Sequence, residues 1–354
     1  MTTTQTLKGS ELNVVQWQVT GHSQPLSTSY AHHMIDQIAD IGTAKLVIRG
    51  DNPMQRKDLF SLIDYATSRN ISVSLATEGI AKMSVRAAAN ARDAGISRWA
   101  IRMNTWPDLL DTLSAFRISE LRPFRAGYLL ADHDVPIEID TTVTNANLKH
   151  LEQIADIAQY VFGAKTWNVE MGTPSKRVMS RQMVTADQAE HLLRWMYKET
   201  SMRTIQITTT DAPFYERIML QERSKQSHDS SMPDADREIT DDQLVTIGAQ
   251  KIPHDGNGEI FISHQGDVYP SEHLPLIVGN IRKQELGDVY EHSPLLQELR
   301  TGDRLHGKCS ECVFRNVCGG SRARAFAMTG DYMAADPLCA YVPTLTNSPV
   351  SPIQ

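Results

Sequence analysis

Short apolar or β-branched runs alternate with amphipathic helical patterns over the first 210 residues. The run LNVVQWQV (12–19) precedes the helical pattern YAHHMIDQIADIG (30–42), and KLVIRG (45–50) precedes KDLFSLIDYATSRN (57–70). Four more pairs follow in the same order: ISVSLATEG with MSVRAAANARDAG, SRWAIRMN with PDLLDTLSAF, VPIEIDTTVT with NLKHLEQIADIAQYVFG, and KTWNVEMG with TADQAEHLLRWMYKETS. A last strand, RTIQITTT (203–210), leads into a helix from about residue 212. Strands connected by helices of crossover length are expected to lie parallel.

Six β-then-α units predict an α/β fold, and their spacing suits a partial (β/α)6 barrel better than a doubly wound sheet. Either architecture gathers the reactive residues at the carboxyl ends of the strands. We therefore expect residues 12–223 to form the barrel.

The composition changes after the barrel. Residues 224–245 are polar and acidic, which predicts a linker or surface loop. The segment GNGEIFISHQGDVYP (256–270) then reads as a β-hairpin at the start of a smaller four-cysteine domain, 246–345. Residues 346–354 are predicted to be a tail.

Overall charge and hydropathy narrow the classes of partner. The chain has 354 residues and a net charge of −7, without a basic stripe, so nucleic acid is not an expected partner. An apolar run of roughly 18 residues is needed to span a bilayer, and the sequence has none, so no membrane association is expected. The first residues show no signal pattern, which makes the cytoplasm the expected location.

All four cysteines fall near the end of the chain, in the order Cys309-x2-Cys312-x5-Cys318-x20-Cys339. A two-residue gap lets one tight turn aim two sulfurs at the same centre. Four thiolates satisfy one zinc ion or one [4Fe–4S] cluster, and three close ligands plus a distant one favour the cluster. Four buried thiols without a metal are the remaining alternative.

The cysteine segment GKCSECVFRNVCGGSRARAFAMTGDYMAADPLCAYVP (307–343) resembles the C-terminal iron–sulfur domain of radical SAM enzymes of the SPASM and twitch type. Its cysteine spacing is similar to that of the haem-biosynthesis branch. The segments 262–282, IDTTVTNANL (139–148) and TTTDAPFYERIMLQ (208–221) also resemble segments of this family. The resemblance implies a radical SAM partial barrel and one [4Fe–4S] cluster on Cys309, Cys312, Cys318 and Cys339.

The resemblance fails at one motif. Family members follow their first strand with Cys-x3-Cys-x2-Cys, which holds the cluster that binds and reduces S-adenosylmethionine. The matching positions here are Ser23, Ser27 and Tyr30, and none is a usual iron–sulfur ligand. The family's Gly-Gly-Glu-Pro loop reads Gly50-Asp51-Asn52-Pro53. Binding of S-adenosylmethionine and radical initiation are therefore not expected.

Charged residues stand where the family's cofactor would bind. The expected pocket residues, at or near the carboxyl ends of strands, are Arg49, Asp51, Glu78, Arg102 and Glu170. One interpretation is that they form ion pairs that fill an emptied cavity. The other is a reworked pocket, with Arg49 and Arg102 binding the carboxylate of an anionic or zwitterionic ligand.

These features favour a pseudoenzyme: an iron–sulfur protein that acts as a binding, carrier or electron-transfer partner in a peptide-modification or tetrapyrrole/cofactor pathway. Its expected partner is a peptide, a tetrapyrrole or a homologous enzyme. The first alternative is an enzyme that uses the barrel pocket for non-radical chemistry on a small anionic substrate. The second is a sensor that reads ligand or redox state through the cluster.

The cysteine spacing predicts about four irons per chain in protein purified without oxygen, because each cube holds four iron atoms. Iron and zinc are to be measured together by elemental analysis of the same sample. One zinc per chain without iron would show that the cysteines hold a zinc ion instead of the cluster.

Overall fold

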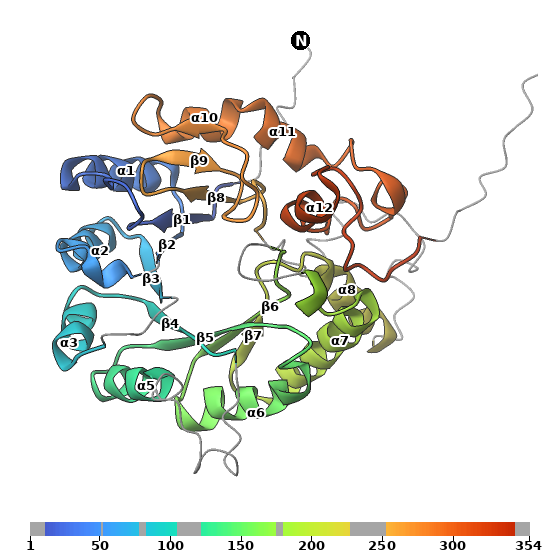
Figure 1. Cartoon of the computed structure of the whole chain (residues 1–354), viewed down its shortest axis with the longest axis horizontal. Coiled ribbons are helices and arrows are strands. Elements are labelled where there is room, and N and C mark those ends of the chain that lie inside the picture. The colour runs from blue at the N-terminus through green and yellow to red at the C-terminus, as the bar shows by residue number, and fades with distance from the viewer. Residues whose placement is uncertain are drawn as a thin grey trace, which may run out of the picture.

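The structure, a computed structural model, describes residues 11–50, 52–77, 83–104, 122–174, 180–226 and 253–343. In this part of the chain a single sheet of ten strands has the order β10-β9-β8-β1-β2-β3-β4-β5-β6-β7. Strands β1 to β7 are parallel to their neighbours, and they curve into the wall of an open barrel (Figure 1). The predicted α/β fold with a largely parallel sheet is confirmed.

The parallel strands are short, and helices connect them along the chain. Their bounds are β1 Val14–Gln18, β2 Lys45–Arg49, β3 Ser72–Thr77, β4 Arg98–Arg102, β5 Ile137–Thr142, β6 Thr166–Glu170 and β7 Gln206–Thr208. The helices on the outside of the wall are α1 Thr28–Ile41, α2 Leu59–Ser68, α3 Val85–Asp93, α5 Arg122–Asp132, α6 Leu151–Asp156 with a π-helical end Ile157–Val161, α7 Ala186–Met202 and α8 Phe214–Gln226.

Side chains alternate between the two faces of this wall, as they must in extended strands. Trp17, Trp99 and Trp167 are almost completely buried in the apolar layer between strands and helices. Trp167, for example, packs edge to face against Trp195 of α7, with ring centroids 6.2 Å apart. Many of the positions between these apolar residues carry polar side chains, which line the inner face of the wall.

The predicted hairpin does not belong to a separate sheet. Strand β8 (Glu259–Ile262) pairs in parallel with β1, and β9 (Asp267–Tyr269) returns antiparallel to β8. A short strand, β10 (Gly279–Asn280), closes this edge, and α10 (Leu286–His292) and α11 (Pro294–Thr301) follow. The sheet therefore continues past the domain boundary that the acidic segment 224–245 suggested.

One helix of the structure was not among the helices that the sequence predicted. The expected helix at 107–116 lies outside the described residues, and α5 is the described helix that precedes β5. Pro123 and Gly127 weakened its pattern in the sequence. Gly127 is needed because a Cβ at this position would lie 2.4 Å from a ring carbon of Phe162, so only glycine lets the end of the α6 segment approach α5.

The last helix, α12 (Arg322–Thr329), lies on the open side of the barrel, near β8 and α8 (Figure 1). Arg324 fixes it there. Its guanidinium is fully buried, forms an ion pair of 2.9 Å with Asp336, and donates to the backbone carbonyls of Gly172 and Asp211, 3.2 and 2.9 Å away. Gly172 and Asp211 lie just beyond β6 and β7, so one side chain joins the C-terminal segment to the barrel.

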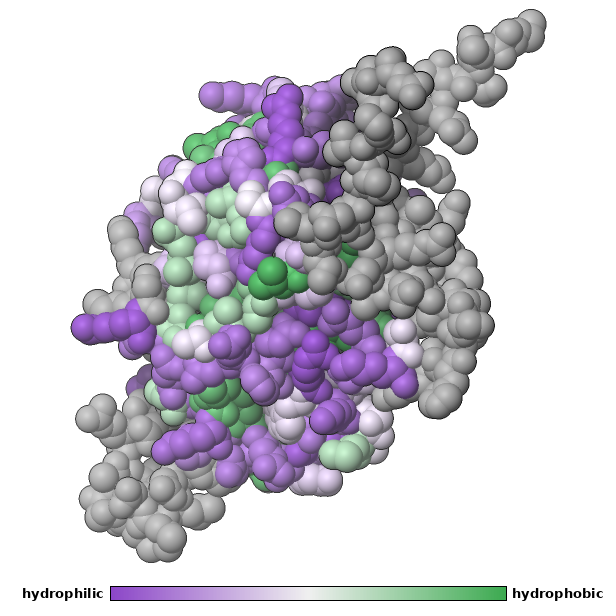
Figure 2. All heavy atoms as spheres, turned by 90° about the vertical axis from the view of Figure 1, so that its right-hand side faces the viewer, coloured by the Kyte–Doolittle hydropathy of each residue, from purple (hydrophilic) through white to green (hydrophobic). Residues whose placement is uncertain are grey.

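The face on the right of Figure 1 is drawn toward the viewer in Figure 2, where apolar residues form small patches between polar ones. Within the described ranges, no helix is long and apolar enough to cross a membrane.

Replacing Arg324 with Met removes the guanidinium but keeps an apolar side chain. Asp336, which is completely buried, would then keep a charge without its partner, and such losses cost about 3–5 kcal/mol. We expect the free energy of unfolding, measured by urea titration of circular dichroism, to fall by about this amount. Arg92→Met on the surface of α3 is the control and should change it by less than about 1 kcal/mol. Equal stability of the two variants would contradict the role of Arg324.

Candidate functional site

The structure places three of the predicted pocket residues at the ends of strands. Arg49, Arg102 and Glu170 are the last residues of β2, β4 and β6. Asp51 and Glu78, which the sequence also suggested, lie outside the described residues.

Both arginines are already paired. Arg49 lies 3.0 Å from the Glu272 carboxylate and donates to Gln16 Oε1 at 2.6 Å. Arg102 lies 3.1 Å from the Glu170 carboxylate and donates to Thr142 Oγ1 at 2.6 Å. Each guanidinium is therefore already held by a carboxylate of the protein, which uses part of its set of N–H donors.

The pairing stabilises the charged form of these carboxylates. Burial alone would raise the pKa of Glu170, but Arg102 and Arg49 bring it below its usual value. Arg49 likewise lowers the pKa of Glu272. The geometry matches ion pairs inside a cavity, which is the first of the two interpretations of these residues.

Two further acids lie in the same cavity and were not picked out from the sequence. Burial raises the pKa of Asp140 on β5 to about 7, with a further contribution from Glu170 and Glu138. Burial, aided by Asp255, raises the pKa of Glu259 on β8 to about 8. For Asp140 the signal was the alternation of polar and apolar residues in IEIDTT, which marks an inward polar face, whereas EIFI has a single polar residue, Glu259.

The three positions of the missing cysteine motif hold side chains that make other contacts. Ser23 shares a hydrogen bond of 2.7 Å with His264, and Ser27 caps α1 by accepting from the Tyr30 backbone N–H. Tyr30 is 44% exposed, and the guanidinium of Arg282 lies 5.5 Å from its ring centroid. Hydroxyl groups are not the ordinary ligands of an iron–sulfur cluster.

The four cysteines come together at the end of the chain. Cys312 follows Cys309 through a tight turn, in which the Cys312 backbone N–H lies 3.4 Å from the Cys309 carbonyl oxygen. Burial raises the pKa of Cys318 well above its usual value, and the charges of Cys339, Cys309 and Cys312 add to the rise, which places all four sulfurs in one neighbourhood. The Gly320 backbone N–H donates to Cys318 Sγ at 3.3 Å.

A buried arginine stands beside this group. Arg217 on α8 is 1% exposed, pairs with Glu190 on α7 and lies 5.0 Å from the ring centroid of Tyr341. Burial would lower the pKa of Arg217, but Glu190, Cys339 and Cys318 raise it, so its positive charge lies close to the thiols. A fixed cation of this kind stabilises thiolates and the cluster that they would hold.

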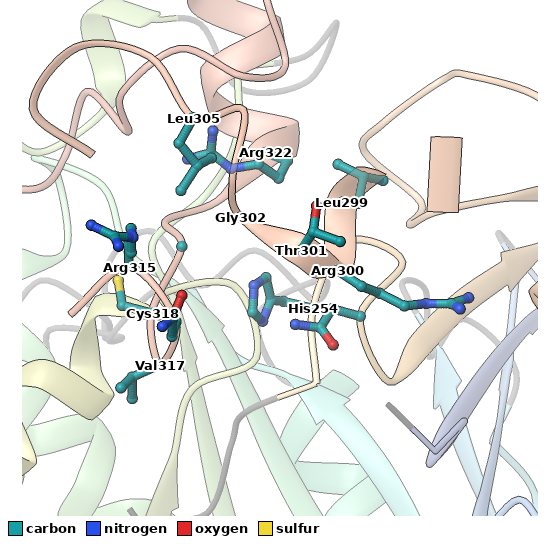
Figure 3. Close-up of a pocket in the computed structure, with 13 residues that line it drawn as sticks. His254, Leu299, Arg300, Thr301, Gly302, Leu305, Arg315, Val317, Cys318 and Arg322 are labelled. Atoms are coloured by element: carbon teal, nitrogen blue, oxygen red, sulfur yellow. The ribbon is translucent and has the colours of Figure 1, made fainter. Parts of the chain in front are cut away.

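A small hollow of about 20 Å³ opens next to Cys318. Figure 3 shows Cys318, Val317 and Arg315 along one loop and His254 across the hollow from them. The cysteine group therefore lies close to the surface of the protein on this side.

The residues present fit a [4Fe–4S] cluster. Its cube binds each thiolate at a different iron, so four thiols in one partly buried neighbourhood, with backbone N–H groups and a cation beside them, are the donor set that it needs. The donor set is complete, although among the described residues no three His, Cys, Asp or Glu side chains form a group that could hold a metal ion. Cys309, Cys312, Cys318 and Cys339 would hold the cluster.

Solved structures with the same fold include Streptococcus suis SuiB bound to precursor peptide SuiA, with a TM-score of 0.69, 12% identity, and coverage of 94% of this chain and 76% of that one. Native anSMEcpe with bound AdoMet has a TM-score of 0.62 at 13% identity, over 92% of this chain and 93% of that one. These identities show that the fold is shared.

Similarity in sequence extends over almost the whole chain. The model of the SPASM domain, an iron–sulfur cluster-binding domain, matches residues 254–313. The AdoMet-dependent heme synthase of Methanosarcina barkeri is 32% identical, over 90% of this chain and 88% of that protein. The PqqA peptide cyclase of Granulibacter bethesdensis is 22% identical, over 90% of this chain and 80% of that protein. The chain therefore belongs to the SPASM-domain family of radical SAM proteins, to which the AdoMet-dependent heme synthases are related.

Proposed function

We propose that this protein is an iron–sulfur member of the family that carries one [4Fe–4S] cluster and does not start radical chemistry from S-adenosylmethionine. The observation that carries the proposal is the set Ser23, Ser27 and Tyr30 between β1 and α1. A radical SAM cluster needs three thiolates at these positions, and every cysteine of the chain lies between residues 309 and 339.

The contacts of these residues support the proposal. Ser27 stabilises the first turn of α1 as its N-cap, and Ser23 is held by His264 from the loop after β8. Their hydroxyls thus serve the local fold, and a cluster at this position would have to break both hydrogen bonds. The four C-terminal cysteines keep the complete ligand set of one cluster.

The function that remains is binding or electron transfer. The protein would act as a binding, carrier or electron-transfer partner in a peptide-modification or tetrapyrrole pathway in the cytoplasm, and its partner would be a peptide, a tetrapyrrole or a homologous enzyme. The names of the relatives support this range, since they include a heme synthase and peptide cyclases, and SuiB was solved with a precursor peptide. Arg217 supports electron transfer, because a nearby cation eases the addition of an electron to a cluster.

The alternative, an enzyme that acts on a small anionic substrate, has less support. It needs Arg49 and Arg102 as carboxylate ligands, and both form short ion pairs with Glu272 and Glu170. An anionic substrate would have to share these arginines with the acids or displace them, and displacement would leave the acids buried without a partner, which is costly.

Incubation of the iron-loaded protein with S-adenosylmethionine and dithionite should yield no 5′-deoxyadenosine above a sample without protein, measured by liquid chromatography and mass spectrometry. The physical reason is that no thiolates are present to hold a reducing cluster beside the cofactor. The heme synthase of Methanosarcina barkeri, treated in the same way, is the positive control. Production of 5′-deoxyadenosine by this protein at several turnovers per chain would disprove the proposal.

A further inference from the structure

The inner face of the barrel encloses a cavity of about 500 Å³. Alternate residues of the strands line it, among them Val14 and Lys45, the first residues of β1 and β2. Arg98, the first residue of β4, has a side chain that is 37% exposed. The cavity thus reaches solvent at the amino ends of the strands, opposite the end that carries Ser23 and Ser27.

The cations that line this cavity are Lys45, Arg49, Arg98 and Arg223. Arg49, Arg98 and the neighbouring Arg102 each have a carboxylate of their own. Arg98 lies 3.1 Å from Glu138, Arg102 lies 3.1 Å from Glu170, and Arg49 lies 3.0 Å from Glu272.

Asp140 and Glu259 line this cavity without an ion pair among the described residues, and a third buried acid, Glu216, also lines it. Asp140 is 5% exposed, and its hydrogen-bond donor is the Asn168 amide at 3.3 Å. Glu259 is 6% exposed and accepts from Gln16 at 2.8 Å. A buried carboxylate with one weak neutral donor is poorly stabilised, so these acids lack both a cation and sufficient hydrogen-bond donors.

Unpartnered polar atoms line the same cavity. Asn168 Oδ1, Ser74 Oγ and the Tyr215 hydroxyl are buried without a hydrogen-bond partner. Their residues are 6%, 3% and 4% exposed. Asn168 lies in register with Asp140 on the neighbouring strand, so a carboxylate and an amide oxygen without a partner stand side by side. Buried polar atoms are usually satisfied, and these three unsatisfied atoms belong to residues that line the same cavity.

We propose that this cavity binds a small organic cation whose protonated nitrogen donates N–H hydrogen bonds to Asp140 and Asn168. The proposal rests on the binding role proposed above for the protein, and it names the class of ligand that the barrel would hold. A protonated amine supplies both what the acids lack, a positive charge, and what the amide oxygen lacks, a donor. A carboxylate ligand would bring further acceptors to acids that lack donors.

The raised pKa values of the two acids in the empty cavity are consistent with a cationic ligand. Burial raises the pKa of Asp140 to about 7, where Glu170 and Glu138 add to the rise and Arg102 and Arg49 oppose it. For Glu259 the pKa rises to about 8, with Asp255 adding and Arg49, Gln16 and Lys45 opposing. Both acids are therefore partly protonated near pH 7 when the cavity is empty. A bound cation would lower both pKa values and expel on the order of one proton.

The test is isothermal titration calorimetry of the full-length, iron-loaded protein with 1,4-diaminobutane at pH 7, in two buffers of different ionisation enthalpy. Butane-1,4-diol and succinate serve as neutral and anionic ligands of the same length. We expect binding of the diamine with release of about one proton and no binding of the other two. Asp140→Asn should weaken diamine binding about tenfold or more and reduce the proton release. Asp64→Asn, an exposed site on α2, is the matched control and should behave like the wild type.

Circular dichroism will show whether the Asp140→Asn variant is folded, and its neutral side chain should make the empty protein at least as stable at pH 8. Preferred binding of succinate, no binding of the diamine, or equal diamine affinity in folded Asp140→Asn and wild type would overturn the inference. None of these results touches the assay for 5′-deoxyadenosine, so the two proposals fail independently.

Discussion

The buried ion pair between Arg324 and Asp336 is the interaction on which the arrangement of this protein depends. Asp336 lies between the ligands Cys318 and Cys339 in the chain, and its carboxylate also accepts from the Ser321 backbone N–H at 2.8 Å. Arg324 reaches from there to the backbone beyond β6 and β7. The same contact that closes the open side of the barrel therefore fixes the segment that brings the fourth cysteine back to the other three. A cluster at this position would strengthen the contact, because metal ligands contribute directly to the folding free energy.

The carboxyl end of the barrel and its interior differ in their chemistry. At the carboxyl ends of the strands, the hydroxyls of Ser27 and Ser23 serve as a helix cap and a hydrogen-bond partner, and the arginines are paired with acids of the protein itself. In the interior, Asp140 has no ion pair among the described residues, which leaves it weakly stabilised. A fold that kept one cluster and gave up its radical-generating site would be free to hold a different kind of ligand in the barrel.

Much of the fold could be predicted from the sequence, because apolar and polar residues alternate along the strands and one face of each strand is buried. The parallel strands, most of the helices between them and the terminal positions of Arg49, Arg102 and Glu170 were accessible from periodicity. The pairing of β8 with β1 was not, because a hairpin pattern does not reveal which sheet its outer edge joins. Helix α5 was missed because Gly127, required by Phe162, reads as a helix breaker. Asp140 and Glu259 were missed because the burial that raises their pKa values is a property of the closed wall and not of the local sequence.

The central claim is that the protein holds a cluster at its C-terminal cysteines and none beside α1. Anomalous X-ray scattering at the iron edge, from crystals of protein loaded with iron and sulfide without oxygen, locates every iron in the molecule. We expect one compact iron peak enclosed by Cys309, Cys312, Cys318 and Cys339, and no iron between β1 and α1. A second iron peak next to Ser23, Ser27 and Tyr30 would contradict the claim, because it would show that these side chains still hold the cluster of a radical SAM enzyme.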